Sequence, residues 1–235
     1  MSARSQSAKD IEAILGPPPG SPGFAEYIAR QEQQRQATGY VTVPEDRLRR
    51  YDYEQAARPL SEIVNLDFTP VDLRGTALAG FELLGGSADH FDGNRASALH
   101  RTFRTPSSAV LDLFEWDMSA HGGSVTADPS RQTERVNGLP AGLFIMQAPS
   151  GRAVSILSWT EGRRWYQLMI KANVKTTDLS PGLTDIANSI PKSVPARLIE
   201  TPAGPPGLLE FPPELPPALP GFPPALPPGL PAPGR

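Results

Sequence analysis

The strongest constraint on the fold is a sequence motif that occurs twice in the chain, which we call the Pro-Ser phrase. The segment TPSSAVLDLFEW (105–116) returns 43 positions later as APSGRAVSILSW (148–159). Each copy opens on Pro-Ser, which favours a turn because proline pre-sets φ at the second turn position. Each then runs through an apolar stretch and ends at a tryptophan. This order predicts a turn followed by a strand in both places.

A second matched pair lies upstream of each phrase. FDGNRASALHRTF (91–103) and VNGLPAGLFIMQA (136–148) are 45 positions apart. Their Asp-Gly and Asn-Gly pairs indicate tight hairpins, because both central residues of a type I′ turn need positive φ. Together the two pairs predict a three-stranded meander in each half of the domain. A duplicated unit and two uses of common hairpin chemistry both explain the repeat.

The pattern predicts seven strands in one sheet. Short connections make neighbouring strands antiparallel, and the Gly85-Gly86 pair inside the first strand indicates a β-bulge. The expected strands cover 80–90, 96–104, 109–116, 131–136, 140–147, 152–159 and 164–172.

One face of such a sheet can stay in water, but the other needs a cover. The segment SPGLTDIANSIP (180–191) can supply that cover as a helix. Ser180 can cap it and Pro181 can take its first helical position. Its apolar residues then fall on one side at helical spacing: Leu183, Ile186, Ala187 and Ile190.

Residues 1–59 are expected to form an arm of three short helices. The first follows Ser7 and ends at GPPPG (16–20), the second begins after Pro22, and the third covers 45–57. Such narrow apolar stripes make helices that are marginal alone. We therefore expect them to dock on this chain, on a second copy or on a partner. The candidate partner-binding residues are Phe24, Tyr27, Ile28, Leu48 and Tyr51.

Composition sets the end of the chain apart. The chain has 28 prolines and 21 glycines, too many for an evenly packed globule. Residues 201–235 are the richest in proline, which lacks an N–H and fixes φ, so we expect a disordered polyproline tail. The tail is either a spacer or, because P-x-x-P recurs, a ligand for an aromatic-lined groove. The domain organisation is thus a helical arm (1–59), a sheet domain (60–200) and this tail.

Several functional classes have no support. The chain has no cysteine, which excludes disulfides and thiolate metal sites. Its net charge of −3 gives no general attraction to nucleic acid. Neither a signal sequence nor an 18-residue apolar run is present, so we expect a cytoplasmic protein without a transmembrane segment.

The histidines offer weak candidates for chemistry. On its expected strand, His100 alternates with Leu99 and Phe103, so we expect it to face solvent. Asp89, His90 and Asp92 have donor atoms for a metal, although a turn is also rich in Asp for backbone reasons. A catalytic site is a further alternative to a plain polar loop, and it would use three residues: Glu115, Asp117 and His121. The tryptophans are expected in the core or at its rim.

The stretch from about 60 to 172 resembles the C-terminal sensory domain of bacterial anti-sigma factors. GFELLGG, VLDLFEW, VNGLPAGLFIMQAPSG and LSWTEGRRWYQLMI carry the resemblance. It implies a sheet domain that regulates through protein binding, with a sigma factor or another regulator as partner. This sequence departs from the family in two ways. The linking region ATGYVTVPEDRLRRYDYEQAARPL has no transmembrane helix, and the His/Cys zinc motif of many members is absent.

These patterns together predict an α+β protein with an antiparallel sheet and a covering helix. We expect a non-enzymatic regulatory or binding module, with no catalytic residue, cofactor or metal. The alternative is a structural or envelope-associated protein that contacts partners through its proline-rich tail.

Overall fold

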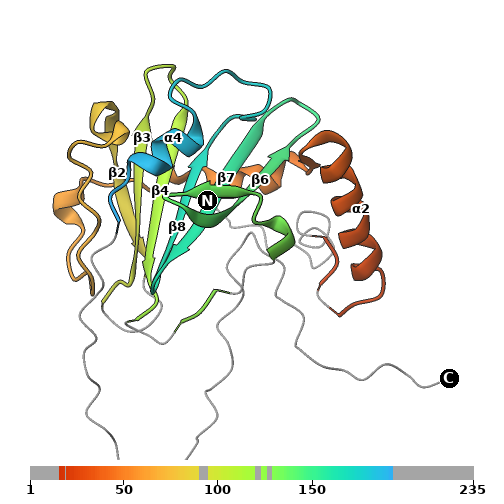
Figure 1. Ribbon diagram of the computed structural model, residues 1–235, viewed down its shortest axis with the longest axis horizontal. Helices are drawn as coiled ribbons and strands as arrows, with labels where there is room; N and C mark the ends of the chain where they lie inside the picture. The colour runs from red at the N-terminus through yellow and green to blue at the C-terminus, as the bar shows by residue number, and fades with distance from the viewer. Residues whose placement is uncertain (1–15, 19, 90–94, 120–122, 126–128, 193–235) are drawn as a thin grey trace, which may run out of the picture.

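The computed structural model describes residues 16–18, 20–89, 95–119, 123–125 and 129–192. They form one α+β fold around a single sheet, as the sequence predicts (Figure 1). The strands are β1 (Val41–Thr42), β2 (Glu82–Asp89), β3 (Ala98–Arg104), β4 (Val110–Asp117), β5 (Glu134–Val136), β6 (Leu139–Gln147), β7 (Ala153–Glu161) and β8 (Arg164–Ile170). The helices are α2 (Phe24–Thr38), α3 (Glu45–Leu48) and α4 (Leu183–Ser189), with 3-10 turns η1 (Arg49–Tyr51), η2 (Tyr53–Gln55), η3 (Leu60–Glu62), η4 (Ala77–Gly80) and η5 (Pro129–Arg131).

The two Pro-Ser phrases form hairpins of the same geometry. The N–H of Ser108 donates to the Thr105 carbonyl at 2.8 Å, and the N–H of Gly151 donates to the Ala148 carbonyl at 2.9 Å. Ser108 and Gly151 both have positive φ, at 67° and 89°. The Asn-Gly turn at 137–138 also has two positive φ values, of 51° and 82°. The matching Asp-Gly pair lies outside the described residues.

The strand order is β1-β6-β7-β8-β4-β3-β2, with β5 paired to β6. The strand β8 therefore lies between the hairpins β3–β4 and β6–β7. It pairs antiparallel with both β4 and β7. Leu113, Leu168 and Leu157 stand in one row across these three central strands and are fully buried. The seven expected strands correspond to β2–β8, while β1, which pairs parallel with β6, was not expected.

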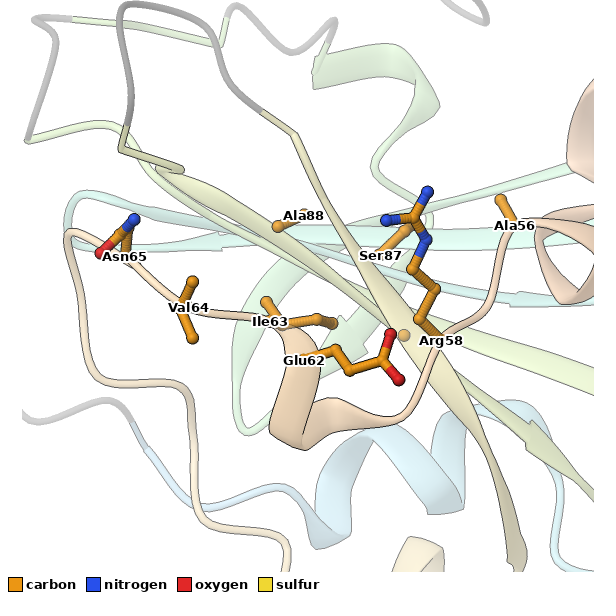
Figure 2. A pocket seen from close by; sticks show the side chains of 9 residues that line it. Ala56, Arg58, Glu62, Ile63, Val64, Asn65, Ser87 and Ala88 are labelled. Carbon is orange, nitrogen blue, oxygen red and sulfur yellow. The ribbon is translucent and has the colours of Figure 1, made fainter.

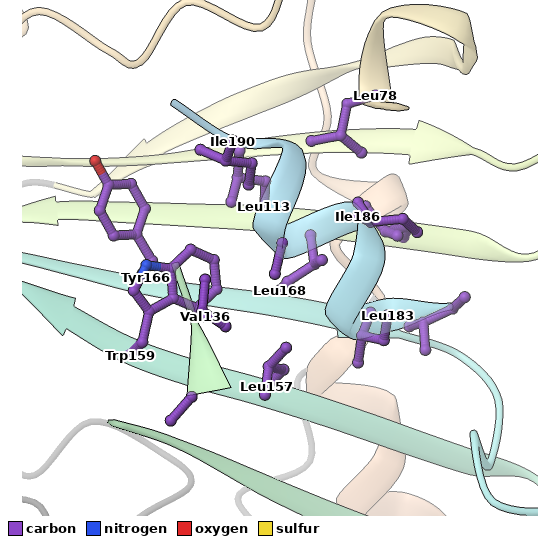
Figure 3. Close-up of a cluster of buried hydrophobic side chains, with 14 of the residues drawn as sticks. Leu78, Leu113, Val136, Leu157, Trp159, Tyr166, Leu168, Leu183, Ile186 and Ile190 are labelled. Atoms are coloured by element: carbon purple, nitrogen blue, oxygen red, sulfur yellow. The ribbon is translucent and has the colours of Figure 1, made fainter. Parts of the chain in front are cut away.

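The helix α4 covers one face of the sheet (Figure 3). Its stripe is buried as predicted, through Leu183, Ile186, Ala187 and the following Ile190. Because each side chain removes apolar surface from water, this layer is a main source of stability. The predicted start was wrong: the helix begins at Leu183 with Gly182 as its N-cap residue, so Ser180 does not cap it.

The opposite face is covered too, although it was expected to be able to stay in water. The N-terminal segment supplies this cover, with Val41, Val43, Leu48 and Tyr51 buried against strand residues that include Met146. The arm and the sheet thus share a core.

The single helix expected over 45–57 was wrong, because α3, η1 and η2 replace it. The change of direction falls at Asp52, where ψ is 54°. The Asp52 carboxylate accepts hydrogen bonds from Arg152, just before β7, and from Lys171, just after β8, both at 2.5 Å. The second helix begins close to its expected position, as α2, and none of its residues is buried.

Candidate functional site

A segment that we call the strap, residues 53–71, wraps around the outer edge of β2. It starts on the arm-covered face, where Tyr53 stacks on His100 of β3. It crosses the edge at Arg58, which forms an antiparallel bridge with Gly86. It ends on the α4 face, where the N–H of Val71 donates to Glu115 of β4 at 2.9 Å. The strap therefore connects both faces of the sheet.

Two glycines allow the strap to lie this close to β2. Gly85 has φ of 138°, and a Cβ there would stand 2.5 Å from the carbonyl oxygen of Arg58. A Cβ on Gly86 would stand 2.7 Å from Leu60 of the strap. The strand register shifts between Leu83 and Gly85, so the predicted bulge is confirmed. The Gly-Gly pair is needed because any side chain would push the strap away.

His100 fastens the strap on the arm-covered face. Its Nδ1 lies 2.7 Å from Asp112 Oδ2, and the Thr102 hydroxyl donates to the other Asp112 oxygen at 2.8 Å. The Nε2 atom lies 3.4 Å from Asp89. The prediction that His100 faces solvent was wrong, since it is only 6% exposed. Its side chain does point away from Leu99 and Phe103, but the arm covers that face.

The charge on His100 depends on its neighbours. Burial alone would lower the pKa of the imidazole, because a low dielectric disfavours the charged form. Asp112 and Asp89 outweigh burial and raise the pKa of His100 to about 9. At neutral pH His100 is thus a buried cation paired with two carboxylates. Burial raises the pKa of Tyr53 as well, so its hydroxyl stays neutral.

A second polar cluster fastens the strap on the α4 face. Arg101 of β3 donates to the Val71 carbonyl at 2.9 Å and forms a short contact with Glu115. Burial raises the pKa of Glu115 and lowers that of Arg101, and their pairing opposes both shifts. Buried charges of this kind persist only when paired.

The carboxylates of the candidate catalytic site are therefore occupied by structural contacts. Glu115 lies 3.7 Å and Asp117 lies 3.8 Å from Arg164, and Asp117 also accepts from the N–H of Ser119 at 2.9 Å. The third member, His121, lies outside the described residues. So do His90 and Asp92 of the candidate metal site. No group of three metal-ligating side chains occurs among the residues that the structure describes.

The strap leaves an open groove along the last part of β2 (Figure 2). The groove has a volume of about 470 Å³ and a mostly apolar floor. Its rim carries Val64, which is 62% exposed and is one of two large hydrophobic side chains so exposed in the described ranges. The lining residues are Ala56, Arg58, Glu62, Ile63, Val64, Asn65, Gly86, Ser87 and Ala88.

The groove also exposes the backbone of an edge strand. Gly86 exchanges both backbone hydrogen bonds with Arg58, at 2.8 Å each, so its N–H and C=O point outward from the sheet. Successive residues of a strand alternate, so the N–H and C=O of Ala88 point the same way. Within the described chain, no backbone hydrogen bond joins Ala88 to the strap. Among the residues that the structure describes, the N–H and C=O of Ala88 thus have no backbone partner on the outer side of β2.

The five candidate partner-binding residues lie in two different environments. Leu48 and Tyr51 are buried in the core between the arm and the sheet, so they are not a free surface. Phe24, Tyr27 and Ile28 lie half-buried on α2. The Tyr27 hydroxyl accepts a hydrogen bond from Arg47, at 2.9 Å. Sequence reasoning missed the groove, although the Gly-Gly bulge was a signal that another backbone approaches there.

A second hollow, of about 440 Å³, lies beside the two Pro-Ser turns. Its two cations are Arg152 and Lys171, and both are paired with Asp52. Glu54 also contacts Lys171. This hollow therefore presents no unpaired positive charge to an anionic ligand.

Comparison with protein-family models, with curated proteins and with solved structures returns no match for this chain. Within the described part of the chain, every helix is too short or too polar to cross a bilayer.

Proposed function

We propose that this chain is a non-enzymatic regulatory module that binds an extended, apolar segment of a protein partner along the edge of β2. The observation that carries the proposal is the groove beside Ala88, where open backbone groups lie next to apolar side chains. Addition of a strand to a sheet edge is a common mode of peptide recognition. Backbone hydrogen bonds supply affinity, and side-chain pockets supply specificity.

The groove suits an apolar side chain better than a charged one. Ile63 and Val64 line one side, and Ala56 and Ala88 complete the apolar lining. Covering Val64 would remove its exposed surface from water, and each Å² of apolar surface contributes about 25 cal/mol. A long open edge strand promotes non-specific pairing, and natural proteins usually protect such edges. The strap protects β2 at Gly86 and leaves the Ala88 end open.

A sigma factor is the partner class that the resemblance to anti-sigma sensory domains favours. Direct binding to purified sigma factors, and to short peptides tiled across them, tests this proposal with the full chain. The residues 60–172 that carry the resemblance include the groove lining from Glu62 to Ala88. The cytoplasmic location expected from the sequence belongs to the same proposal.

The decisive variant is Val64→Asp, which places a charge on the groove rim. We expect it to weaken peptide binding at least tenfold, because the charge loses water when the segment docks. The matched control is Leu83→Asp, an exposed apolar residue of β2 that does not line the groove. The control should bind as the parent chain does. If the Val64→Asp variant binds the peptide as tightly as the parent chain does, the proposal is wrong.

A second candidate surface is the outer side of α2. This helix has 15 residues and none is buried, which leaves Phe24, Tyr27 and Ile28 partly accessible. An Ile28→Asp variant separates this surface from the groove, since the two lie at opposite edges of the sheet (Figure 1). If partner binding survives Val64→Asp but not Ile28→Asp, α2 is the binding surface.

The alternative of a structural protein acting through its proline-rich tail predicts a different result. Removing residues 201–235 would then abolish partner contact, while Val64→Asp would leave it intact. The same binding assay distinguishes the two.

A further inference from the structure

We infer that the groove beside Ala88 takes the carboxy-terminal end of a partner chain, with an apolar last residue beside Val64 and the terminal carboxylate on Arg58. This inference rests on the proposed function, because it names the kind of segment that the same groove accepts. Two features of the strap carry it. Its backbone blocks one end of the position that an added strand would take, and its Arg58 guanidinium has no partner in the described chain.

The strap already fills part of the outer edge of β2. At Gly86 the backbone of Arg58 occupies this edge, with two hydrogen bonds of 2.8 Å. A segment that pairs with Ala88 cannot continue past this bridge, because the outward N–H and C=O of Gly86 already have partners. The segment must either turn away from the sheet or end beside Ala88.

The strap also fixes the side wall of the groove at both ends. Beyond the groove it contacts the sheet again just before β3, where the N–H of Ala96 donates to the Asn65 carbonyl at 2.9 Å. The Ala96 carbonyl accepts from the N–H of Asp67, also at 2.9 Å. Between these contacts and the bridge at Gly86 lie the apolar side chains Ile63 and Val64. The volume of about 470 Å³ is in the lower part of the range of small-ligand sites, which suits a short chain end with an apolar side chain.

Arg58 supplies a positive charge at the blocked end of the groove. Several other exposed arginines are paired, as Arg74 is with Asp72. Arg58 is exposed, and among the described residues its guanidinium has neither a hydrogen bond nor an ion pair. Figure 2 shows its side chain extending from the bridge toward Ser87, which also lines the groove. A guanidinium binds a carboxylate through two parallel hydrogen bonds, so this end of the groove suits a terminal carboxylate.

Charge and direction both favour a carboxyl end over an amino end. Glu62 also lines the groove, but Figure 2 shows its carboxylate beside the bridge and away from Ala88. A segment that ends opposite Ala88, with its carboxylate toward the bridge, runs antiparallel to β2. The strap itself is antiparallel at Arg58 and Gly86. Antiparallel pairing is slightly more stable per residue than parallel pairing.

Two peptide libraries that differ only at the carboxyl end test the inference. Both consist of acetylated hexapeptides that end in valine, leucine or isoleucine after five random residues. One library has a free terminal carboxylate, and the other has a carboxamide. The immobilised full chain should retain the carboxylate library at least tenfold more, because the pair with Arg58 is charge-assisted and bidentate. Equal retention of the two libraries, or retention of neither, would overturn the inference.

The variant Arg58→Gln identifies the group that binds the carboxylate. It removes the guanidinium and keeps the backbone groups that bridge to Gly86, so the preference for the carboxylate library should disappear. The matched control is Arg50→Gln, since Arg50 is also exposed and unpaired within the described ranges but does not line the groove. The control should keep the preference. A preference that survives Arg58→Gln would mean that another group binds the carboxylate, and the inference would be wrong.

A third library tests the opposite polarity. Its hexapeptides have a free amino end, an apolar first residue and a carboxamide at the other end. The parent chain should retain it no better than the acetylated carboxamide library. Stronger retention, lost in Glu62→Gln, would show that the groove binds amino ends, which contradicts the inference.

Hydrogen exchange at the Ala88 amide locates the contact. A peptide selected from the carboxylate library should slow this exchange at least tenfold in the parent chain. Val64→Ser removes apolar surface without adding a charge that would repel the carboxylate, and it should weaken binding of the peptide at least threefold. A bound peptide that leaves exchange at Ala88 unchanged lies elsewhere, and the inference is then wrong.

The two proposals fail separately. If the carboxylate and carboxamide libraries are retained equally and Val64→Ser weakens both, the groove binds internal segments; the inference is then wrong and the proposed function stands. If the carboxylate preference depends on Arg58 but Val64→Ser binds as the parent chain does, the carboxylate is held outside the apolar groove, and both proposals fail.

Discussion

The ring of Tyr53 lies against the ring of His100, with centroids 4.2 Å apart and planes 23° apart. Tyr53 starts the strap and His100 belongs to β3, so this stacking closes the arm over the sheet. The ring of Phe114 in β4 packs against the same imidazole, with ring centroids 4.6 Å apart. A cation is attracted to the face of an aromatic ring. The charged imidazole of His100 contacts two such rings, Tyr53 of the strap and Phe114 of β4.

Removal of the buried carboxylate behind this stack should destabilise the fold. Asp112→Ala removes the nearer of the two carboxylates that pair with His100 and leaves only Asp89, at 3.4 Å. Loss of one partner of a buried pair costs about 3–5 kcal/mol. Urea unfolding monitored by tryptophan fluorescence measures the free energy of unfolding. Asp72→Ala is the control, because Asp72 pairs with Arg74 at the exposed surface. An Asp112→Ala chain as stable as the control would contradict a paired, charged His100.

The stability of the protein should fall as pH rises through the alkaline range. The folded pKa of His100 is about 9 and lies above its ordinary value of 6.5. The contribution of protonated His100 to the free energy of unfolding is therefore complete below about pH 6.5, and it is lost as pH rises toward 9. Its size is of the order of 1–3 kcal/mol. Comparison of urea unfolding at pH 6 and pH 9 in the parent chain and in His100→Gln should show a steeper loss in the parent chain. Parallel pH profiles would mean that the imidazole is neutral.

The close approach of strap and strand should depend on Gly86. Gly86→Ala places a Cβ against the His100 carbonyl and Leu60, and overpacking of this kind costs about 1–3 kcal/mol. Hydrogen exchange at the Arg58 amide, which donates to Gly86, should also become faster. Gly80→Ala is the matched control, since a Cβ there meets no atom within 4 Å. Unchanged exchange at Arg58 in Gly86→Ala would show that the strap is not held by this bridge.

The arm should behave as part of the folded core. Leu48 is fully buried, and Leu48→Ala should lower the free energy of unfolding by about 2–5 kcal/mol. Ile28 on α2 is half-exposed, so Ile28→Ala should cost less than about 1 kcal/mol. Thermal unfolding followed by circular dichroism ranks the two variants. Equal stability of both would mean that the arm is not docked in solution.

Local patterns predicted the elements of this fold well. Turn chemistry identified the Pro-Ser hairpins and the Asn-Gly turn, because proline and positive-φ residues act within four positions of the chain. The spacing of Leu183, Ile186 and Ile190 identified the covering helix for the same reason. The position of β8 between the hairpins depends on pairing between distant strands, and no local signal specifies it.

The site was less predictable than the fold. Alternation placed His100 on the correct side of β3, but its exposure depends on Tyr53 and Asp112, which come from other elements. Leu48 and Tyr51 looked available because the sequence does not show which surface covers a narrow apolar stripe. The groove at Ala88 arises from the path of the strap, and only the Gly-Gly pair indicated it.

The central place of β8 has a consequence for biosynthesis. The hairpins β3–β4 and β6–β7 are made first and can pair locally, whereas the strand that joins them leaves the ribosome later than both. Until Ile170 has emerged, β4 and β7 each present an unsatisfied inner edge, and such edges invite association between nascent chains. Completion of the sheet is thus a late event in the translation of this polypeptide, and chaperone dependence should be greatest in the interval just before it.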